Sequence, residues 1–532
     1  MNMGLLLAAI IIIACVLMNK VSHRIGIPML LAFIALGMFF GSDGVVKIPF
    51  EDYKFAEQTC SVALIFIMFY GGFGTKTSEA KPVLGKALLL SSLGVVLTAA
   101  LTGLFCHFIL KIELWESFLI GSVLGSTDAA SVFSILRSKK LNLKYKTASL
   151  LEIESGSNDP FAYMLTMIIL SVMSGRASAG GVVYLIIAQL VFGVAIGIAL
   201  AFAAAWFMRH FRFATSGFDA AFVLGVAVLA YALPSMVGGN GYLSTYIVGI
   251  VLGNQNIHNK KALVHFFDGL TGLMQMLIFF LLGLLAFPSQ IPNVLLPSIA
   301  ISLFLTFIAR PLVVGAILTP ARAKLRQQAV VSWAGLRGAA SIVFAIMATV
   351  SEAFTNNDVF HIAFCVVLFS IAFQGSLLPL VAHKTKMLDE TGNVLKTFND
   401  YSDETAVRFV GFTLKEGHPW TGKKIKNIPF PPEMLLVAVL CEGETIVPDG
   451  ETCLACGDNI IFNAPALQGC EDVHFHEIAV GPKNPWTGKS IAEIDLPPGN
   501  LCIMIKRGEQ TVIPKGGTLI QSSDILVINS KD

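Results

Sequence analysis

Charged residues are scarce in this chain. Only 14% of its 532 residues are Asp, Glu, Lys or Arg, whereas 55% are hydrophobic. A soluble globular protein carries roughly 25% charged residues, so this shortage predicts an integral membrane protein in contact with lipid. The formal net charge of +2 carries no information on a nucleic-acid partner, because charges are sparse up to about residue 382 and dense after it, and we expect no such partner.

Several motifs that define other classes of protein are missing. The sequence contains no Walker-type phosphate loop and no potassium-channel filter of the TVGYG kind. Its nine cysteines show no disulfide framework. The first apolar run ends at Asn19 and Lys20 without a small-residue cleavage site, so we expect a first membrane helix there. We predict a protein that is not an enzyme and has no cofactor.

Apolar runs follow one another as far as residue 382. A helix needs about 20 residues to cross a bilayer, or somewhat fewer. Thirteen runs can be placed, at 3–18, 27–41, 58–75, 87–110, 117–137, 149–174, 181–208, 218–238, 242–254, 264–287, 294–319, 329–350 and 359–382. The run at 242–254 is the shortest, and a helix broken at Gly-rich sequence could account for its length. The sequence therefore predicts an α-helical polytopic membrane protein with about 13 transmembrane helices.

Lys and Arg are distributed unevenly between the loops. They gather after the odd-numbered segments, for example in RSKKLNLKYK, and are rare after the even-numbered ones. By the positive-inside rule, this alternation predicts an N-terminus outside and a C-terminal tail in the cytoplasm. We expect a multi-pass protein of the cell (inner) membrane.

Ionisable residues inside membrane segments are costly, and this makes them functional candidates. The fifth segment contains Thr127 and Asp128 in GSTDAASVF, and the sixth contains EIESGSNDP. The eleventh contains Arg310 and the twelfth contains Arg337. These few polar groups are where we look for a site.

Small residues accompany the polar groups of the fifth and twelfth segments. Gly and Ser surround Thr127 and Asp128, while Gly335 and Gly338 flank Arg337. Interrupted membrane helices need such residues, because their freed backbone groups must be approached closely and bonded again. We therefore predict that helices 5 and 12 are broken. They are seven apart, as expected if helices 1–6 and 8–13 are inverted repeats with a transport site at the bilayer midplane.

The sixth segment carries its polar groups on one helical face. Glu154 and Asn158 are four residues apart, and so are Ser155 and Asp159. Glu154 has two possible partners for a buried ion pair, Arg310 and Arg337, because an unpaired arginine at this depth is costly. Asp159 is then the acid left to change its protonation state. We predict a site where helices 5, 6 and 12 meet.

At these residues the sequence resembles a known family. STDAASVF, ESGSNDP, WAGLRGA and GYLSTYIVGIVLGNQ are similar to the signature segments of bacterial monovalent cation/proton antiporters of the NhaP type, and most similar to the potassium/proton antiporter (cell-volume-regulation) branch. The likeness covers residues 1–385 and implies a homodimer with a rigid part and a mobile core in each protomer. Tyr70 is a departure, because relatives often carry an acid there.

The resemblance also implies roles for individual residues. Asp159 would take either a cation or a proton, and Asn158 would mark electroneutral exchange. Glu154 and Arg337 would form a structural ion pair. The cation site would be completed by three further residues: Thr127, Asp128 and Ser155.

The chemistry of these side chains agrees with cation exchange. Na⁺ and K⁺ are hard cations that prefer oxygen ligands, and burial favours the protonated form of a carboxylate. A cation and a proton can then compete for Asp159. We predict a secondary antiporter that exchanges K⁺, or alternatively Na⁺, for protons. The competing interpretation is a ligand-gated cation channel with the tail as its gate.

The tail after Lys386 has a different pattern. Short Val, Ile and Leu runs bounded by Gly, Pro and Asp are typical of small β-rich modules. Residues 418–462 align with residues 484–528 without a gap. Each copy resembles the C-terminal domain of potassium-conductance regulators (RCK-C or TrkA-C), which implies regulation, with a small nucleotide as a possible ligand.

The predicted domain layout has four parts. A cation/proton antiporter transmembrane domain occupies 1–385, and a linker follows at 386–404. The first RCK-C-like domain occupies 405–467 and the second occupies 471–532. We expect a small β-rich (α+β) tail.

Overall fold

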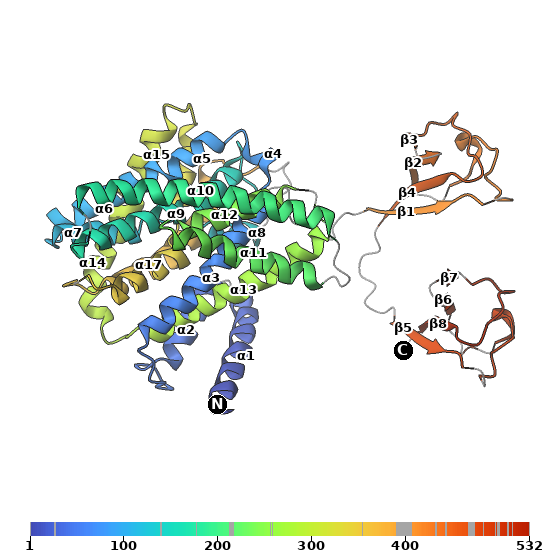
Figure 1. The fold of residues 1–532 in the computed structure, drawn as a ribbon, viewed down its shortest axis with the longest axis horizontal. Coiled ribbons are helices and arrows are strands. Elements are labelled where there is room, and N and C mark those ends of the chain that lie inside the picture. The colour runs from blue at the N-terminus through green and yellow to red at the C-terminus, as the bar shows by residue number, and fades with distance from the viewer. Residues whose placement is uncertain are drawn as a thin grey trace. The chain divides into compact units, whose positions relative to one another are not determined.

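The computed structural model describes residues 2–389 and 407–530, apart from 26, 27, 139, 140, 177, 212–216, 256, 258 and 354 in the first range and 416, 431–433, 442, 443, 466–473, 482, 483, 495, 497–500, 508, 509 and 513 in the second. The chain divides into two compact units, Met1–Tyr401 and Ser402–Asp532. The first unit is helical and the second contains small antiparallel sheets (Figure 1). This confirms the predicted fold class.

Helices occupy most of the first unit and overlap every predicted membrane segment. By length and composition, seven helical spans among the described residues can cross a membrane, and five further apolar helices are shorter. The number of thirteen crossings stays a prediction. The elements are α1 Asn2–Ile25, α2 Met29–Phe40, α3 Tyr53–Gly74, α4 Thr77–Ala80, α5 Leu84–Ser91, α6 Leu93–Phe108, α7 Leu114–Val123, α8 Ala129–Ser138, α9 Thr147–Met173, α10 Ala179–His210, α11 Gly217–Met236, α12 Gly241–Gly253, α13 Lys260–Leu285, α14 Ile291–Phe304, η1 Leu305–Ala309, α15 Arg310–Leu318, α16 Leu325–Trp333, α17 Ala339–Val350, α18 Val359–Phe369, η2 Ser370–Gly375 and α19 Ser376–Lys384.

Glycines allow two pairs of helices to pack with their backbones in contact. A Cβ atom at Gly72 of α3 would overlap the carbonyl oxygen of Tyr246 in α12. A Cβ atom at Gly37 of α2 would likewise overlap the carbonyl oxygen of Phe280 in α13, which also packs against α3. Because interiors are close-packed, any side chain at these glycines would push the helices apart. Helices α2, α3, α12 and α13 thus form one tightly packed group.

The fifth and twelfth segments are broken, as predicted. Helix α7 ends at Val123 and α8 begins at Ala129, while α16 ends at Trp333 and α17 begins at Ala339. The two breaks touch each other, because the backbone N–H of Asp128 donates to the carbonyl oxygen of Leu336 at 2.7 Å. A backbone group that lost its helical partner at one break is therefore hydrogen-bonded by the other break, because backbone groups inside a membrane must be paired.

The tail contains two sheets of the same design. Their strand orders are β1-β4-β2-β3 and β5-β8-β6-β7, and all neighbouring strands are antiparallel. The register of β2 against β4 shifts between Leu436 and Ala438, and that of β6 against β8 shifts at the matching positions, between Cys502 and Met504. The sequence repeat is therefore a repeat of the fold. The strands are β1 Val407–Thr413, β2 Leu435–Cys441, β3 Glu444–Ile446, β4 Asn459–Pro465, β5 His474–Ala479, β6 Leu501–Arg507, β7 Gln510–Val512 and β8 Ile525–Ser530.

The predicted domain boundaries remain proposals. Most of the predicted linker, from residue 390 to 404, lies outside the described residues, as do the first two residues of the predicted domain at 405.

Candidate functional site

The polar face of α9 lies against the break between α7 and α8. Ser155 Oγ donates a hydrogen bond to the carbonyl oxygen of Thr127. The side-chain amide of Asn158 donates to Thr127 Oγ1 at 2.5 Å, and Asp159 accepts a hydrogen bond from Ser126 Oγ. All five residues are buried. The structure therefore brings together four of the residues predicted from the sequence, and it adds Ser126.

The side-chain oxygen of Asn158 has no hydrogen-bond partner among the described residues, although it is buried. Leaving a buried acceptor unpaired costs about 1–3 kcal/mol. Asn158 and Asp159 are neighbours on α9 and bond to Thr127 and Ser126 at the same helix break, so amide, carboxylate and hydroxyl oxygens gather there, which are ligands of the kind that hard cations take. The residues present thus suit a dehydrated monovalent cation as cargo.

Asp128 caps the second half of the broken helix. Its carboxylate accepts hydrogen bonds from the backbone N–H of Ser131, at 3.3 Å, and from the Ser131 hydroxyl. This places a negative charge at the positive end of the α8 dipole. A Cβ atom at Gly338 would overlap the same carboxylate, so α17 begins directly against it. The predicted part of Asp128 in a cation site stays a proposal.

Arg337 closes the first half of the same break. Its guanidinium Nη1 donates to the carbonyl oxygens of Gly125 and Ser126 at 3.1 and 2.6 Å. These carbonyls follow the C-terminal end of α7, where a cation is stabilised by the helix dipole. The buried Arg337, which precedes α17, therefore caps the C-terminal end of α7 with a positive charge.

Glu154 pairs with Arg310. The Arg310 guanidinium donates to a carboxylate oxygen of Glu154, and both side chains are buried. The family resemblance implied a pair between Glu154 and Arg337, and the structure corrects this, because the hydrogen bonds described for the Arg337 guanidinium go to the end of α7. Arg310, one of the two partners that the residues alone left open, is the one in contact.

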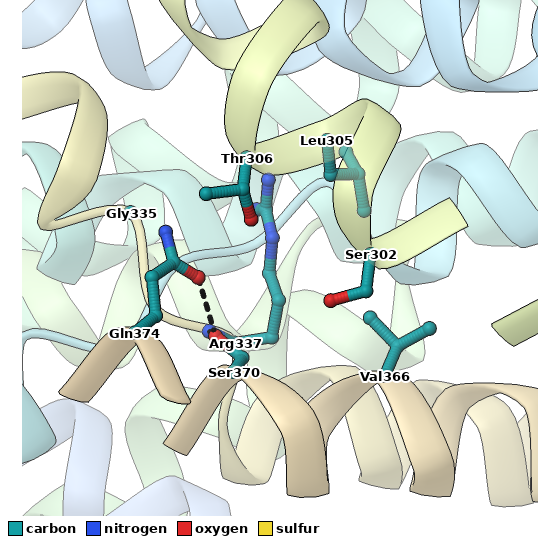
Figure 2. Close-up of a pocket in the computed structure, with 8 residues that line it drawn as sticks. All are labelled: Ser302, Leu305, Thr306, Gly335, Arg337, Val366, Ser370 and Gln374. Atoms are coloured by element: carbon teal, nitrogen blue, oxygen red, sulfur yellow. Dashed lines mark hydrogen bonds between the residues drawn. The ribbon is translucent and has the colours of Figure 1, made fainter. Parts of the chain in front are cut away.

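A small cavity lies on another side of Arg337 (Figure 2). It holds about 10 Å³ of space, close to the volume that one water molecule needs. The backbone N–H of Arg337 donates to Ser370 Oγ, and Ser370 Oγ donates to Gln374 Oε1, both at 2.9 Å. The cavity lies between two π-helical turns, η1 and η2, and it is lined by Ser302, Leu305, Thr306, Gly335, Arg337, Val366, Ser370 and Gln374.

Sequence reasoning missed Asn240, which joins α12 to the site helix. Its side-chain amide donates to the carbonyl oxygen of Pro160 at 2.8 Å, next to Asp159. Its side-chain oxygen accepts from the backbone N–H of Leu243 at 3.0 Å and so caps α12. An Asn before an apolar helical run is a helix-start signal, so the cap was predictable from the sequence. The bond to Pro160 was not, because it joins residues that are 80 positions apart in the chain.

Tyr70 stands where an acid was expected from the resemblance. Its hydroxyl donates to a carboxylate oxygen of Asp268 in α13 at 3.0 Å. No local pattern pairs these two residues, because nine helices, α4 to α12, lie between α3 and α13 along the chain. An acid is thus present near this position, supplied by another helix.

Taken together, the fold and the site define a multi-pass membrane transporter whose oxygen-lined site lies at two touching helix breaks. The comparisons identify its family. Residues 7–384 match the family described as "Sodium/hydrogen exchanger, transmembrane", so the chain belongs to the sodium/hydrogen exchanger family. Residues 475–531 match the TrkA-C domain. The resemblance predicted from the motifs is confirmed.

Similar proteins fit this assignment. The chain is 32% identical over 464 residues to the K(+)/H(+) antiporter NhaP of Alkalimonas amylolytica, covering 86% of this chain and 81% of that protein. It is 32% identical over 463 residues to the K(+)/H(+) antiporter NhaP2 of Shewanella sp. (strain MR-4), covering 86% and 80%. The solved sodium proton antiporter MjNhaP1 of Methanocaldococcus jannaschii has the same fold, with a TM-score of 0.64, 23% identity and coverage of 72% of this chain and 99% of that one.

Proposed function

We propose that this chain is a secondary antiporter that exchanges a monovalent cation for protons across the membrane. The observation that carries the proposal is the buried Asp159 carboxylate, which bonds to Ser126 at a helix break, next in the chain to Asn158 with its unpartnered side-chain oxygen. A buried acid can be neutralised by either a proton or a cation, but holding both is unfavourable because the charges repel. Binding of one therefore displaces the other, which couples their movements.

The geometry also supports electroneutral exchange. Asn158 is neutral, Glu154 is matched by Arg310 and the Asp128 carboxylate is held by Ser131, so we assign the charge that varies during the cycle to Asp159. One proton or one monovalent cation neutralises it to the same extent. An exchange of one for one then moves no net charge. Thr127, Ser155 and Asp128 complete the proposed cation site.

Potassium is the favoured cargo. Two relatives with about a third of their residues identical are named K(+)/H(+) antiporters, and the TrkA-C tail fits regulation linked to potassium. Sodium is the alternative, since MjNhaP1 is named a sodium proton antiporter. The comparisons lend no support to the channel interpretation.

The remaining predictions about assembly belong to the same proposal. The protein would form a homodimer in the inner membrane with its N-terminus outside. The tail would lie in the cytoplasm, where its two RCK-C-like domains, at 405–467 and 471–532, would bind a small nucleotide and regulate the exchange.

Proton flux in proteoliposomes tests the proposal. The full chain is reconstituted with a pH-sensitive dye inside, and K⁺, Na⁺ and Li⁺ are added outside in turn. We expect K⁺ to drive proton movement in the opposite direction without generating a membrane potential. Cation flux that moves no protons would overturn the antiporter and favour a channel.

A further inference from the structure

Tyr246 of α12 lies directly against the site helix at Gly156. A Cβ atom at Gly156 would lie 2.6–2.8 Å from Cε2, Oη and Cζ of Tyr246. The ring therefore fills the space that the missing side chain leaves between Ser155 and Ser157. Tyr246 is only 3% exposed, and its hydroxyl makes no hydrogen bond of normal distance and angle among the described residues, although the Thr75 and Ser157 hydroxyls lie near it. A buried hydroxyl in this position is costly unless something binds it.

Oxygen-bearing side chains surround this hydroxyl. Its polar neighbours are Thr75 at the end of α3 and Ser157 and Glu152 on α9, with Asp159 further along the same helix. Thr75 Oγ1 lies 3.3 Å from a carboxylate oxygen of Glu152. All of these side chains are buried. One carboxylate and two hydroxyls thus lie around an oxygen that makes no well-formed hydrogen bond.

This cluster is separate from the Asp159 site. Glu152 precedes Asp159 by seven residues, so the two acids share a face of α9 about 10 Å apart along the helix axis, at about 1.5 Å per residue. Glu152 is the nearer to the N-terminal end of α9, which the loop charges place on the cytoplasmic side. A group moving between Asp159 and the cytoplasm along this face passes Glu152.

The walls of the cluster are held firmly. The carbonyl oxygen of Thr75 accepts a hydrogen bond from the side-chain amide of Asn254, at the end of α12, at 2.8 Å. The side-chain oxygen of Asn254 accepts from the backbone N–H and the hydroxyl of Thr77, both at 2.9 Å. Helices α3 and α12 also touch through Gly72. Thr75 and Tyr246 therefore belong to one packed unit that faces Glu152.

We propose that Glu152, Thr75, Ser157 and Tyr246 form a second binding site for a monovalent cation, between Asp159 and the cytoplasmic face. The inference rests on the proposed function for its choice of cargo. Carboxylate and hydroxyl oxygens are the ligands that a hard alkali cation takes in place of water, and the negative charge of Glu152 raises the local concentration of cations. The cation supplies the missing partner of the Tyr246 hydroxyl.

A binding measurement tests the second site without relying on exchange. In the full-length Asp159→Asn variant, the first site has lost its charge, and we expect saturable binding of radioactive Rb⁺ to remain. Adding Glu152→Gln should weaken that binding about tenfold or more, since a charged ligand is lost. Glu116→Gln is the matched control, because Glu116 is also buried but lies outside this cluster, where it accepts hydrogen bonds from Asn357, and it should leave Rb⁺ binding unchanged. Equal binding with and without Glu152→Gln, or no binding to Asp159→Asn, overturns the proposal.

A transport measurement tests the sidedness of the site. Tyr246→Phe keeps the ring against Gly156 and removes only the hydroxyl, so we expect the KM for K⁺ to rise about threefold on the cytoplasmic side alone. Tyr242→Phe is the matched control. Tyr242 lies on the same helix, is buried and also has an unpartnered hydroxyl, but it packs against the rings of Tyr163 and Phe344.

The outcomes separate this inference from the function on which it rests. A KM that is unchanged on both sides, or that rises equally on both, overturns the second site while leaving antiport intact. A wild-type protein that exchanges nothing, yet binds Rb⁺ through Glu152, overturns the antiporter and keeps the site.

Discussion

Two acids on α9 have opposite surroundings, although they are only five residues apart. Glu154 is neutralised by the guanidinium of Arg310. Asp159 accepts a hydrogen bond from the neutral hydroxyl of Ser126. A carboxylate paired with arginine stays charged, whereas a buried one beside neutral groups readily takes a proton or a cation. The environment, and not the residue type, separates the ion-paired acid from the acid that we propose to exchange the cation and the proton.

Replacement of Asp159 by Asn should abolish exchange. The substitution keeps the size of the side chain and removes its ability to titrate, so the protein should still fold and insert. Cation-driven proton movement in proteoliposomes measures the loss. Asp43→Asn serves as the control that keeps exchange, because the Asp43 carboxylate is exposed and accepts a hydrogen bond from the backbone N–H of Ser289. Retained exchange in Asp159→Asn would mean that another acid carries the cation.

Truncation of either partner of the buried ion pair should lower stability. Glu154→Ala and Arg310→Ala each leave an uncompensated buried charge, which costs about 3–5 kcal/mol. Thermal unfolding in detergent measures this. The double variant should be less destabilised than the sum of the two single variants, because its remaining charge has been removed as well.

Arg337→Ala provides the comparison for this pair. Removing the guanidinium should also destabilise the protein, but the reason is different: the buried carbonyl oxygens of Gly125 and Ser126 would lose their hydrogen-bond donor. We therefore expect a smaller coupling energy between Arg337 and Glu154 than between Arg310 and Glu154. A larger coupling energy for Arg337 and Glu154 than for Arg310 and Glu154 would instead support the ion pair between Glu154 and Arg337 that the family resemblance implied.

At the scale of elements, the two broken helices depend on each other. Arg337, from the break before α17, caps the end of α7, and Asp128, from the break before α8, packs against Gly338. The breaks also share a backbone hydrogen bond between Asp128 and Leu336. Each break thus supplies the groups that compensate the other, so neither half is expected to be stable without its counterpart.

Gly338→Ala should disrupt this crossing. The added methyl group would overlap the carboxylate of Asp128, and this carboxylate cannot move without losing its bonds to Ser131. We expect a large loss of exchange and a lower unfolding temperature, measured on the purified full chain. Gly225→Ala is the control. Gly225 has open space around it in α11, and alanine favours a helix, so stability should be kept or should rise slightly.

At the scale of the whole molecule, the chain separates transport from regulation. The oxygen-lined site lies entirely in the helical unit, whereas the tail folds into two repeated sheets and includes the TrkA-C match. A regulatory domain can bias a transporter only through interactions that differ between its conformations. The tail is therefore expected to set the conditions of exchange without carrying the ions.

Deletion of the tail from Asn399 onward should leave exchange intact. What should change is its activation by pH, ionic strength or a small ligand such as a cyclic dinucleotide. Proton flux over a range of pH, compared between the full and truncated chains, measures this. A truncated protein that inserts normally but exchanges at no pH would show that the tail belongs to the transport machinery.

Much of the fold was predictable because the signals are local. Apolar run length predicted the helical segments, small residues around Asp128 and Arg337 predicted the breaks, and the ungapped repeat predicted two similar modules in the tail. Hydropathy, backbone permissiveness and turn chemistry act over a few neighbouring residues. Spacing on α9 also placed Ser155, Asn158 and Asp159 on one face.

By itself, the sequence determined which residues are polar in the membrane and which helices break; only the tertiary structure decided which groups meet. From the sequence, Arg310 and Arg337 are equally good partners for Glu154. In the structure the Arg337 guanidinium bonds to the carbonyl oxygens after α7, and Arg310 forms the ion pair with Glu154. The approach of Tyr246 to Gly156 likewise joins residues from distant parts of the chain. Such pairings depend on how helices pack in three dimensions, and no local sequence pattern encodes which residues of two distant helices come into contact.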